Sequence, residues 1–191
     1  MEKKSEMTKA LLGQKLKKLV MEKPFDKITI KMIADEAGVI RATFYNYFQD
    51  KYEAMEWMLA EEVFTEVNEC MDVGKPVEAF RVLLHKLQED REYYAKAYEV
   101  EGQNSFEMMM FHQIYRLAEK LLAGNPGYLQ DGGEYISEEV FLRFQTISFV
   151  NGIRYWLLYA GDIETEKVLD VYRFLMGHTL LDLLQSYRDD I

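Results

Sequence analysis

The sequence contains a single cysteine, Cys70, and only three prolines in 191 residues. One cysteine excludes a disulfide within the chain and is usual in a reducing compartment. Cys70 lies in an apolar row of helical period, so we interpret it as a small core residue rather than a nucleophile. No Gly/Ser-rich or single-charge run marks a disordered linker, which indicates one continuous folded chain.

Long hydrophobic runs are also missing. The most apolar stretch, 140–160, has 14 apolar residues among 21, but Arg143, Gln145, Asn151 and Arg154 interrupt it. A membrane-spanning helix rarely tolerates such polar groups. The first residues alternate charged and apolar side chains, unlike a signal peptide. We therefore expect a soluble, cytoplasmic protein without a membrane partner.

Patterns typical of catalysis or metal binding are absent as well. His85, His112 and His178 have no ligand spacing with carboxylates or with the cysteine, so we expect no metal site. The paired carboxylates at 61–62 and 138–139 are sequence neighbours on exposed faces or helix starts, unsuited to a shared reaction centre. The sequence predicts neither an enzyme nor a bound cofactor.

The net charge of −10 is distributed unevenly along the chain. Residues 3–51 contain 11 Lys and Arg against 6 Asp and Glu, whereas residues 61–191 contain 12 against 24. A basic segment on an acidic remainder is able to bind phosphate with one end while the other end is repelled from it. On this count alone, an ordinary solvated charge distribution explains the sequence equally well.

Apolar residues recur with the period of an α-helix along almost the whole chain, and no alternating strand pattern is found. The pattern predicts an all-α protein of about nine helices. We expect a first helix that ends before Pro24, followed by helices at about 30–37, 41–48, 51–73, 77–91, 92–101, 105–123, 137–161 and 165–188.

The segment TIKMIADEAGVIRATFYNYF, residues 29–48, has the spacing of a helix-turn-helix. Thr29 is a good N-cap for the first short helix. Gly38 stands where the chain must adopt a positive φ, which glycine does at least cost. Inward-facing positions hold Ile33, Ala34, Ala37, Val39, Phe44 and Phe48. The outer face of the second helix presents side chains that suit the DNA major groove: Arg41, Ala42, Thr43, Tyr45, Asn46 and Tyr47.

A wider string of residues is more specific than this pattern. It resembles closely, in order and spacing, the DNA-binding domain of the TetR family over roughly residues 8–56: Thr8–Lys9, Phe25, Ile28–Thr29, Ile33–Ala34, Ala37–Gly38–Val39, Thr43–Phe44–Tyr45, Tyr47–Phe48 and Lys51. The resemblance implies a three-helix, helix-turn-helix DNA-binding domain at 1–50 and a helical ligand-sensing and dimerisation domain at 51–191. It implies a sequence-specific bacterial transcription regulator, a repressor rather than an activator, which binds a two-fold operator in double-stranded DNA.

The resemblance also implies roles for individual residues. Positions that bind backbone phosphates in the family correspond here to Thr29, Thr43, Tyr45, Tyr47 and Lys51, and positions that face the bases correspond to Arg41, Ala42 and Asn46. The chemistry agrees, because an arginine pairs with guanine and an asparagine with adenine through two hydrogen bonds. Ile40 replaces a common capping Ser, Thr or Asn. That hydrogen bond is therefore missing, and Ile40 is left for contact with a thymine methyl group.

The two C-terminal helices carry more apolar surface than one chain needs for its core. We therefore predict a homodimer in which helices 137–161 and 165–188 form a four-helix bundle across a two-fold axis. A monomer whose core uses all of this surface is the alternative.

Aromatic and methionine side chains in the body suggest a site for a small apolar or aromatic effector. The candidate ligand-binding residues are Tyr94, Tyr98, Met109, Tyr115, Tyr155, Trp156 and Tyr159. Such stripes are equally typical of a plain core. The alternative functions are a helical protein-interaction module and a regulator that depends on a co-activator protein without a small-molecule ligand.

Overall fold

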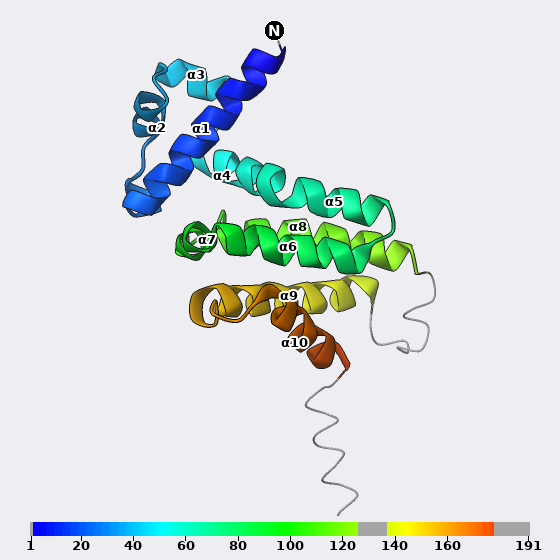
Figure 1. Ribbon diagram of the computed structural model, residues 1–191. Coiled ribbons are helices and arrows are strands. Elements are labelled where there is room, and N and C mark those ends of the chain that lie inside the picture. The colour runs from blue at the N-terminus through cyan, green and yellow to red at the C-terminus, as the bar shows by residue number, and fades with distance from the viewer. Residues whose placement is uncertain (1, 126–136, 178–191) are drawn as a thin grey trace, which may run out of the picture.

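The structure, a computed structural model, describes residues 2–125 and 137–177. This part of the chain folds into nine helices (Figure 1), which confirms the predicted all-α class. They are α1 (Glu2–Glu22), α2 (Ile30–Glu36), α3 (Arg41–Tyr45), one long helix made of α4 (Lys51–Leu59), the π-helical turn η2 (Ala60–Phe64) and α5 (Thr65–Asp72), then α6 (Pro76–Glu89), α7 (Arg91–Ala97), α8 (Phe106–Ala123), α9 (Glu138–Tyr159) and α10 (Thr165–Gly177).

The first three helices form a small N-terminal unit, which we call the head (Figure 1). One face of α1 is apolar, and its side chains Leu12, Leu16, Leu19 and Val20 are buried as the helical period predicts. A short 3₁₀ turn, η1 (Phe25–Lys27), follows Pro24 and leads the chain toward α2. Phe44 and Phe48 close the core of the head with ring centroids 5.5 Å apart.

The chain leaves the head through the long helix α4–η2–α5. The Asp50 carboxylate caps it, accepting hydrogen bonds from the backbone N–H groups of Tyr52 at 2.8 Å and Glu53 at 2.9 Å. The π-helical turn in its middle adds a residue to the helical repeat. Buried side chains continue on both sides of the turn, as predicted, at Met55, Leu59, Val63 and Val67. Cys70 is half-buried against this core.

The remaining helices build the body in layers below the long helix. In Figure 1, α6 and α8 lie next to α4–α5, and α9 and α10 form the outer layer. Gly152 allows α10 to approach α9 closely, because a Cβ atom there would lie 2.1 Å from the Tyr172 hydroxyl oxygen. That hydroxyl donates a hydrogen bond to the carbonyl of Phe149 at 2.9 Å. The rings of Phe80, Phe149 and Tyr172 pack together around this crossing.

Several helix ends differ from those predicted. The helix expected at 92–101 ends at Ala97, because the chain then turns through hydrogen bonds from Glu99 N and Val100 N to Lys96 O and Ala97 O, and reaches a positive φ of 97° at Gly102. The helix expected at 41–48 ends at Tyr45 and continues as a turn that buries Phe48. Of the helix predicted at 165–188, residues 165–177 are helical and the rest lies outside the described residues.

Candidate DNA-binding interface

The turn between α2 and α3 is built as the sequence indicates. The Thr29 hydroxyl caps α2 by accepting a hydrogen bond from the backbone N–H of Met32 at 3.3 Å. Gly38 has a φ of 66°, so the chain reverses where only glycine adopts this conformation easily. Ile33 and Ala34 on α2 and Phe44 on α3 are fully buried. The shared core fixes α3 against α2 and leaves the opposite face of α3 to solvent.

That outer face of α3 carries the residues expected to read DNA. Arg41, Ala42, Tyr45 and Asn46 are exposed. Arg41 Nη2 donates a hydrogen bond to the Tyr45 hydroxyl at 2.8 Å, and its guanidinium lies 5.4 Å from the Tyr45 ring centroid. The two side chains, one helical turn apart, therefore hold each other in place.

Ile40 lies at the N-cap of α3. It makes no side-chain capping hydrogen bond, as predicted, and 73% of its surface is exposed. In this position it borders the outer face of α3.

The predicted phosphate-binding residues flank the same surface. Thr43 and Tyr47 are half-buried at the edge of α3, and Thr29 is exposed at the start of α2. The Ser5 hydroxyl donates a hydrogen bond of 3.4 Å to the Tyr47 hydroxyl, so α1 also reaches this edge. Sequence reasoning did not identify Ser5, because nothing local indicates that α1 passes beside Tyr47.

Lys51, the last predicted phosphate ligand, has an additional role. Its ammonium donates hydrogen bonds to the carbonyls of Phe25 at 2.6 Å and Ile28 at 2.9 Å, and lies 4.5 Å from the Phe25 ring centroid. Burial lowers the pKa of this ammonium, opposed by the charges of Asp26 and Asp50. Lys51 thus fastens the start of α4 to the segment that precedes α2. The ammonium makes a third, longer hydrogen bond of 3.4 Å to the carbonyl of Asp26, and a phosphate would have to replace this bond, because an ammonium has three N–H donors.

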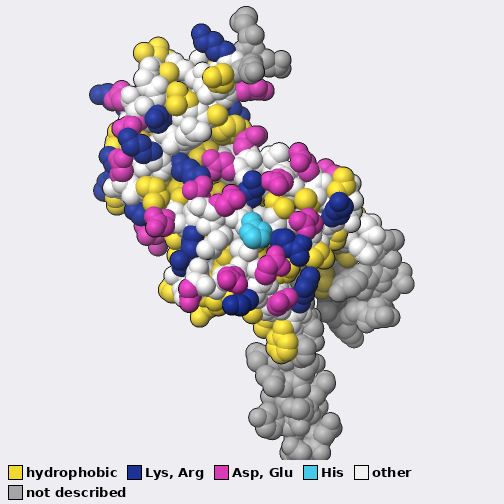
Figure 2. Space-filling model, viewed as in Figure 1, with side chains coloured by type: hydrophobic (Ala, Val, Ile, Leu, Met, Phe, Trp, Pro, Cys, Tyr) yellow, Lys and Arg dark blue, Asp and Glu magenta, His cyan; other side chains and the backbone are white. Residues whose placement is uncertain are grey.

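The charge pattern of the surface follows that of the sequence. Figure 2 shows Lys and Arg side chains spread over the head and many Asp and Glu side chains over the body. The excess of basic residues at 3–51 therefore favours the approach of a polyanion to the head.

The candidate ligand-binding residues are not brought together around one cavity. Tyr94, Tyr98, Met109 and Trp156 are buried in the core. The Trp156 indole N–H donates to the carbonyl of Ile163 at 3.1 Å, a bond that satisfies it without a ligand. Their burial is what both a plain core and an enclosed ligand site require.

The other three candidates lie nearer the surface. Tyr115 is half-buried and its ring stacks on Phe111 with centroids 5.6 Å apart. Tyr155 and Tyr159 are 64% and 73% exposed on α9. Their exposed position suits an interface between chains better than a pocket within one.

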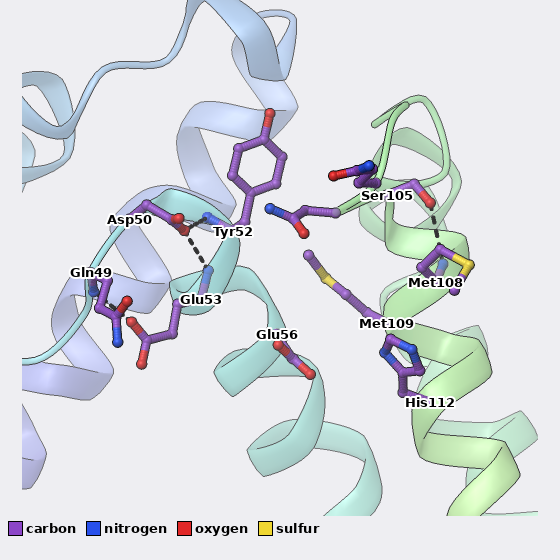
Figure 3. A pocket seen from close by; sticks show the side chains of 11 residues that line it. Gln49, Asp50, Tyr52, Glu53, Glu56, Ser105, Met108, Met109 and His112 are labelled. Carbon is purple, nitrogen blue, oxygen red and sulfur yellow. Dashed lines mark hydrogen bonds between the residues drawn. The ribbon is translucent and has the colours of Figure 1, made fainter.

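A cleft of about 300 Å³ lies between the start of α4 and the start of α8. Figure 3 shows Glu56 of α4 and His112 of α8 on its opposite sides. Of the seven predicted ligand-binding residues, Met109 lines this cleft. Sequence reasoning missed the cleft because its walls come from helices far apart in the chain. Its other lining residues are Gln49, Asp50, Tyr52, Glu53, Gln103, Asn104, Ser105 and Met108.

Two further features are missing from the part of the chain that the structure describes. No three His, Cys, Asp or Glu side chains gather there closely enough to hold a metal ion. None of the helices described combines the length and the apolar composition needed to cross a bilayer.

Comparison with known proteins adds to this geometry. The family model for bacterial regulatory proteins of the tetR family matches residues 16–56, which include α2, α3 and the start of α4. The HTH-type dhaKLM operon transcriptional activator DhaS of Lactococcus lactis subsp. lactis (strain IL1403) is 27% identical over 120 residues. The match covers 63% of this chain and 63% of that relative, so less than two thirds of its length is represented.

Solved structures share the fold over most of the chain. A dihydroxyacetone kinase operon activator DhaS has a TM-score of 0.62 and 20% identity, over 89% of this chain and 94% of that one. FadR of Thermus thermophilus, a TetR family transcriptional repressor solved with lauroyl-CoA, has a TM-score of 0.53 and 19% identity, over 87% and 92% of the two chains. These relatives are described as transcription regulators and not as enzymes. Residues 16–56 of this chain thus match the helix-turn-helix domain of the TetR family, and the described helices beyond them share the fold of solved regulators of this kind.

Proposed function

We propose that this chain is a dimeric, effector-controlled transcription regulator of the bacterial cytoplasm, which represses by placing α3 in the major groove of a two-fold operator. The observation that carries the proposal is the exposed polar face of α3, fixed on the buried core of Phe44, Ile33 and Ala34. A rigid, basic unit with an outward helix of this kind suits groove recognition. We propose that the regulator represses transcription, although the DhaS relative is described as an activator.

In this proposal the head contacts DNA in two ways. Thr29, Thr43, Tyr45, Tyr47 and Lys51 bind the phosphate backbone and set the orientation of the head. Ile40, Arg41, Ala42 and Asn46 face the bases and supply sequence discrimination. Phosphate contacts fix position and base contacts specify sequence.

Salt titration of duplex binding tests the proposal. We expect Lys51→Ala to weaken binding to the DNA upstream of the regulator's own gene and to lower the slope of log K against log salt by about 1, because one phosphate contact is lost. Lys75→Ala is the matched control, since it removes the same charge from an exposed site before α6, outside the proposed DNA and dimer contacts. A slope that stays at its wild-type value would show that Lys51 binds no phosphate and serves only its structural bonds with Phe25 and Ile28.

The proposed dimer uses α9 and α10. The face of α9 that points away from the core exposes a row of apolar side chains: Val140, Phe144, Ile147, Tyr155 and Tyr159. On α10, Val171 and Leu175 are 50% and 58% exposed, while Val168 and Leu169 face the core. Apolar rows on two adjacent helices are typical of a two-fold four-helix interface. Such a dimer would present its two heads to major grooves about 34–36 Å apart, or a multiple of that distance.

We also propose that the domain division lies at residues 50 and 51. Asp50 caps α4, the helix through which the chain leaves the head and enters the body. The head then comprises residues 1–50, and residues 51–191 sense the effector and dimerise.

The proposed effector is a small apolar or aromatic molecule bound within the body. Support comes from Tyr98, whose hydroxyl is buried with no hydrogen-bond partner among the described residues. Burial, followed by the charge of Glu107, raises the pKa of this hydroxyl above its ordinary value, so it remains a neutral donor. An unsatisfied buried hydroxyl is costly, and a ligand oxygen would relieve that cost. The FadR structure was solved with a ligand, lauroyl-CoA.

Tyr98→Phe tests this role of the hydroxyl. We expect the free protein to gain about 1 kcal/mol of unfolding free energy, because an unpaired buried group is removed. Tyr172→Phe, the control, removes a hydroxyl that is bonded to Phe149 O, and we expect it to lose about as much. Urea denaturation measures both changes. Equal destabilisation by the two variants would show that the Tyr98 hydroxyl already has a partner.

A further inference from the structure

Helix α1 belongs to the head, but one of its lysines is fastened to the body. Lys17 Nζ lies 2.6 Å from Glu62 Oε2 and 2.7 Å from Asp90 Oδ2, and its side chain is only 17% exposed. Glu62 lies in the π-helical turn η2, and Asp90 is the residue between α6 and α7. One ammonium therefore joins the head to two separate elements of the body.

The surroundings of Lys17 strengthen this link. Its ammonium lies 4.9 Å from the ring centroid of the buried Tyr93 on α7. Burial alone would lower the pKa of Lys17, but the hydrogen bonds and charges of Asp90 and Glu62 outweigh it and raise the pKa above the ordinary value. A second lysine, Lys96 of α7, donates to the carbonyl of Met21 near the end of α1 at 2.6 Å. Helix α7 thus holds α1 at two points.

The same junction between α6 and α7 also holds the end of α9. Arg91 Nε donates to the carbonyl of Leu157 at 2.9 Å, and Gln88 Nε2 donates to the carbonyl of Gly161 at 3.3 Å. Leu157 lies in the last turn of α9, where carbonyls lack partners within the helix. The Arg91 guanidinium lies directly against Gly161, in space that the Cβ atom of another residue would share.

We infer that residues Gln88–Arg91, the α6–α7 junction, are positioning residues that set the orientation of the DNA-binding head relative to the end of α9. Asp90 holds α1 through Lys17, and the adjacent Arg91 holds α9. A shift of α9 at the dimer interface then moves the junction, and with it α1 and the head. The inference rests on the proposed function, because the orientation of the head matters when two heads bind one operator.

The distance between head and body, measured within one chain, tests this inference without DNA. Nitroxide labels at Lys31→Cys on α2 and Glu119→Cys on α8, in a Cys70→Ser background, report it by pulsed electron paramagnetic resonance. An excess of unlabelled chain removes distances between protomers. We expect one narrow distance distribution in the parent, a broad one for Lys17→Gln, and recovery of the narrow one for Lys17→Arg, which keeps the charge.

Lys18→Gln is the matched control. Lys18 is the next residue on α1, and it pairs within the head with Glu36 at 2.9 Å, so its loss removes the same charge without releasing the body. We expect its distribution to match that of the parent. If Lys17→Gln loses helical circular dichroism, Asp90→Asn makes the same comparison, because it retains the pair between Lys17 and Glu62.

Arg91→Gln gives the decisive result. Arg91 bonds to α9, so a merely local role would leave the distance between head and body unchanged. We expect instead the same broadening as in Lys17→Gln, with duplex affinity lower by about fivefold. A narrow distribution in Arg91→Gln would overturn the inference, whether or not Lys17→Gln broadens it. A protein that binds no duplex would contradict the proposed function and leave the distance result intact.

Discussion

Replacing Phe44 with alanine is expected to lower the free energy of unfolding by about 3–5 kcal/mol, the usual cost of removing a buried phenylalanine. Phe44 is fully buried at the centre of α3, and its ring lies 5.5 Å from that of Phe48 and 5.9 Å from that of Tyr45. With so short a helix, no other side chain of α3 reaches the core as deeply. The cavity would free α3 from α2, and duplex binding would be lost with it.

Urea denaturation followed by circular dichroism measures this effect, and Ile40→Ala provides the comparison. Ile40 begins the same helix but is 73% exposed, so its truncation is expected to change the unfolding free energy by no more than about 0.5 kcal/mol. Comparable losses in the two variants would show that Phe44 does not anchor α3.

Ile147→Arg is expected to convert the proposed dimer to a monomer of 22.6 kDa. Ile147 is 51% exposed in the middle of the apolar row on α9. An arginine there would be buried without a partner, twice in a two-fold interface, and each unpaired buried charge costs several kcal/mol. Loss of the dimer also removes the avidity of two linked heads, which is on the order of 10²–10⁴ in affinity.

Sedimentation velocity distinguishes the two states directly. Val77→Arg is the matched control, because Val77 on α6 is also 51% exposed and lies outside the proposed interface. We expect this variant to remain dimeric and to bind duplex like the parent. A dimeric Ile147→Arg variant, or a monomeric parent, would contradict the proposed interface.

The parts of the fold that depend on local chemistry were predictable from the sequence. The capping hydroxyl of Thr29, the positive φ of Gly38 and the buried side of α3 follow from residues within a few positions of one another. Helical period separates core from surface reliably in short amphipathic segments. The absence of a side-chain capping hydrogen bond at Ile40 was predictable for the same reason.

Interactions between distant segments were not predictable in this way. Lys17 meets Glu62 and Asp90, 45 and 73 residues away, and no local pattern indicates either pairing. Lys51 looks like a free cation in the sequence, because the carbonyls of Phe25 and Ile28 become its partners only when the head folds.

The candidate ligand-binding residues show a related limit. Tyr155 and Trp156 are neighbours of similar chemistry, yet one is exposed and the other buried. Composition alone cannot separate them on a helix such as α9, which is apolar on two sides.

The hydrogen bond between Arg41 and Tyr45 affects how the proposed DNA-contacting helix α3 selects its operator. The guanidinium has five N–H donors and gives one of them to the phenol at 2.8 Å, so the others remain for an external acceptor. The bond to Tyr45 holds the arginine in one orientation before DNA is bound. Because guanine accepts two bonds from a guanidinium in a fixed geometry, this ordering in advance reduces the entropy that Arg41 would lose at a matching base.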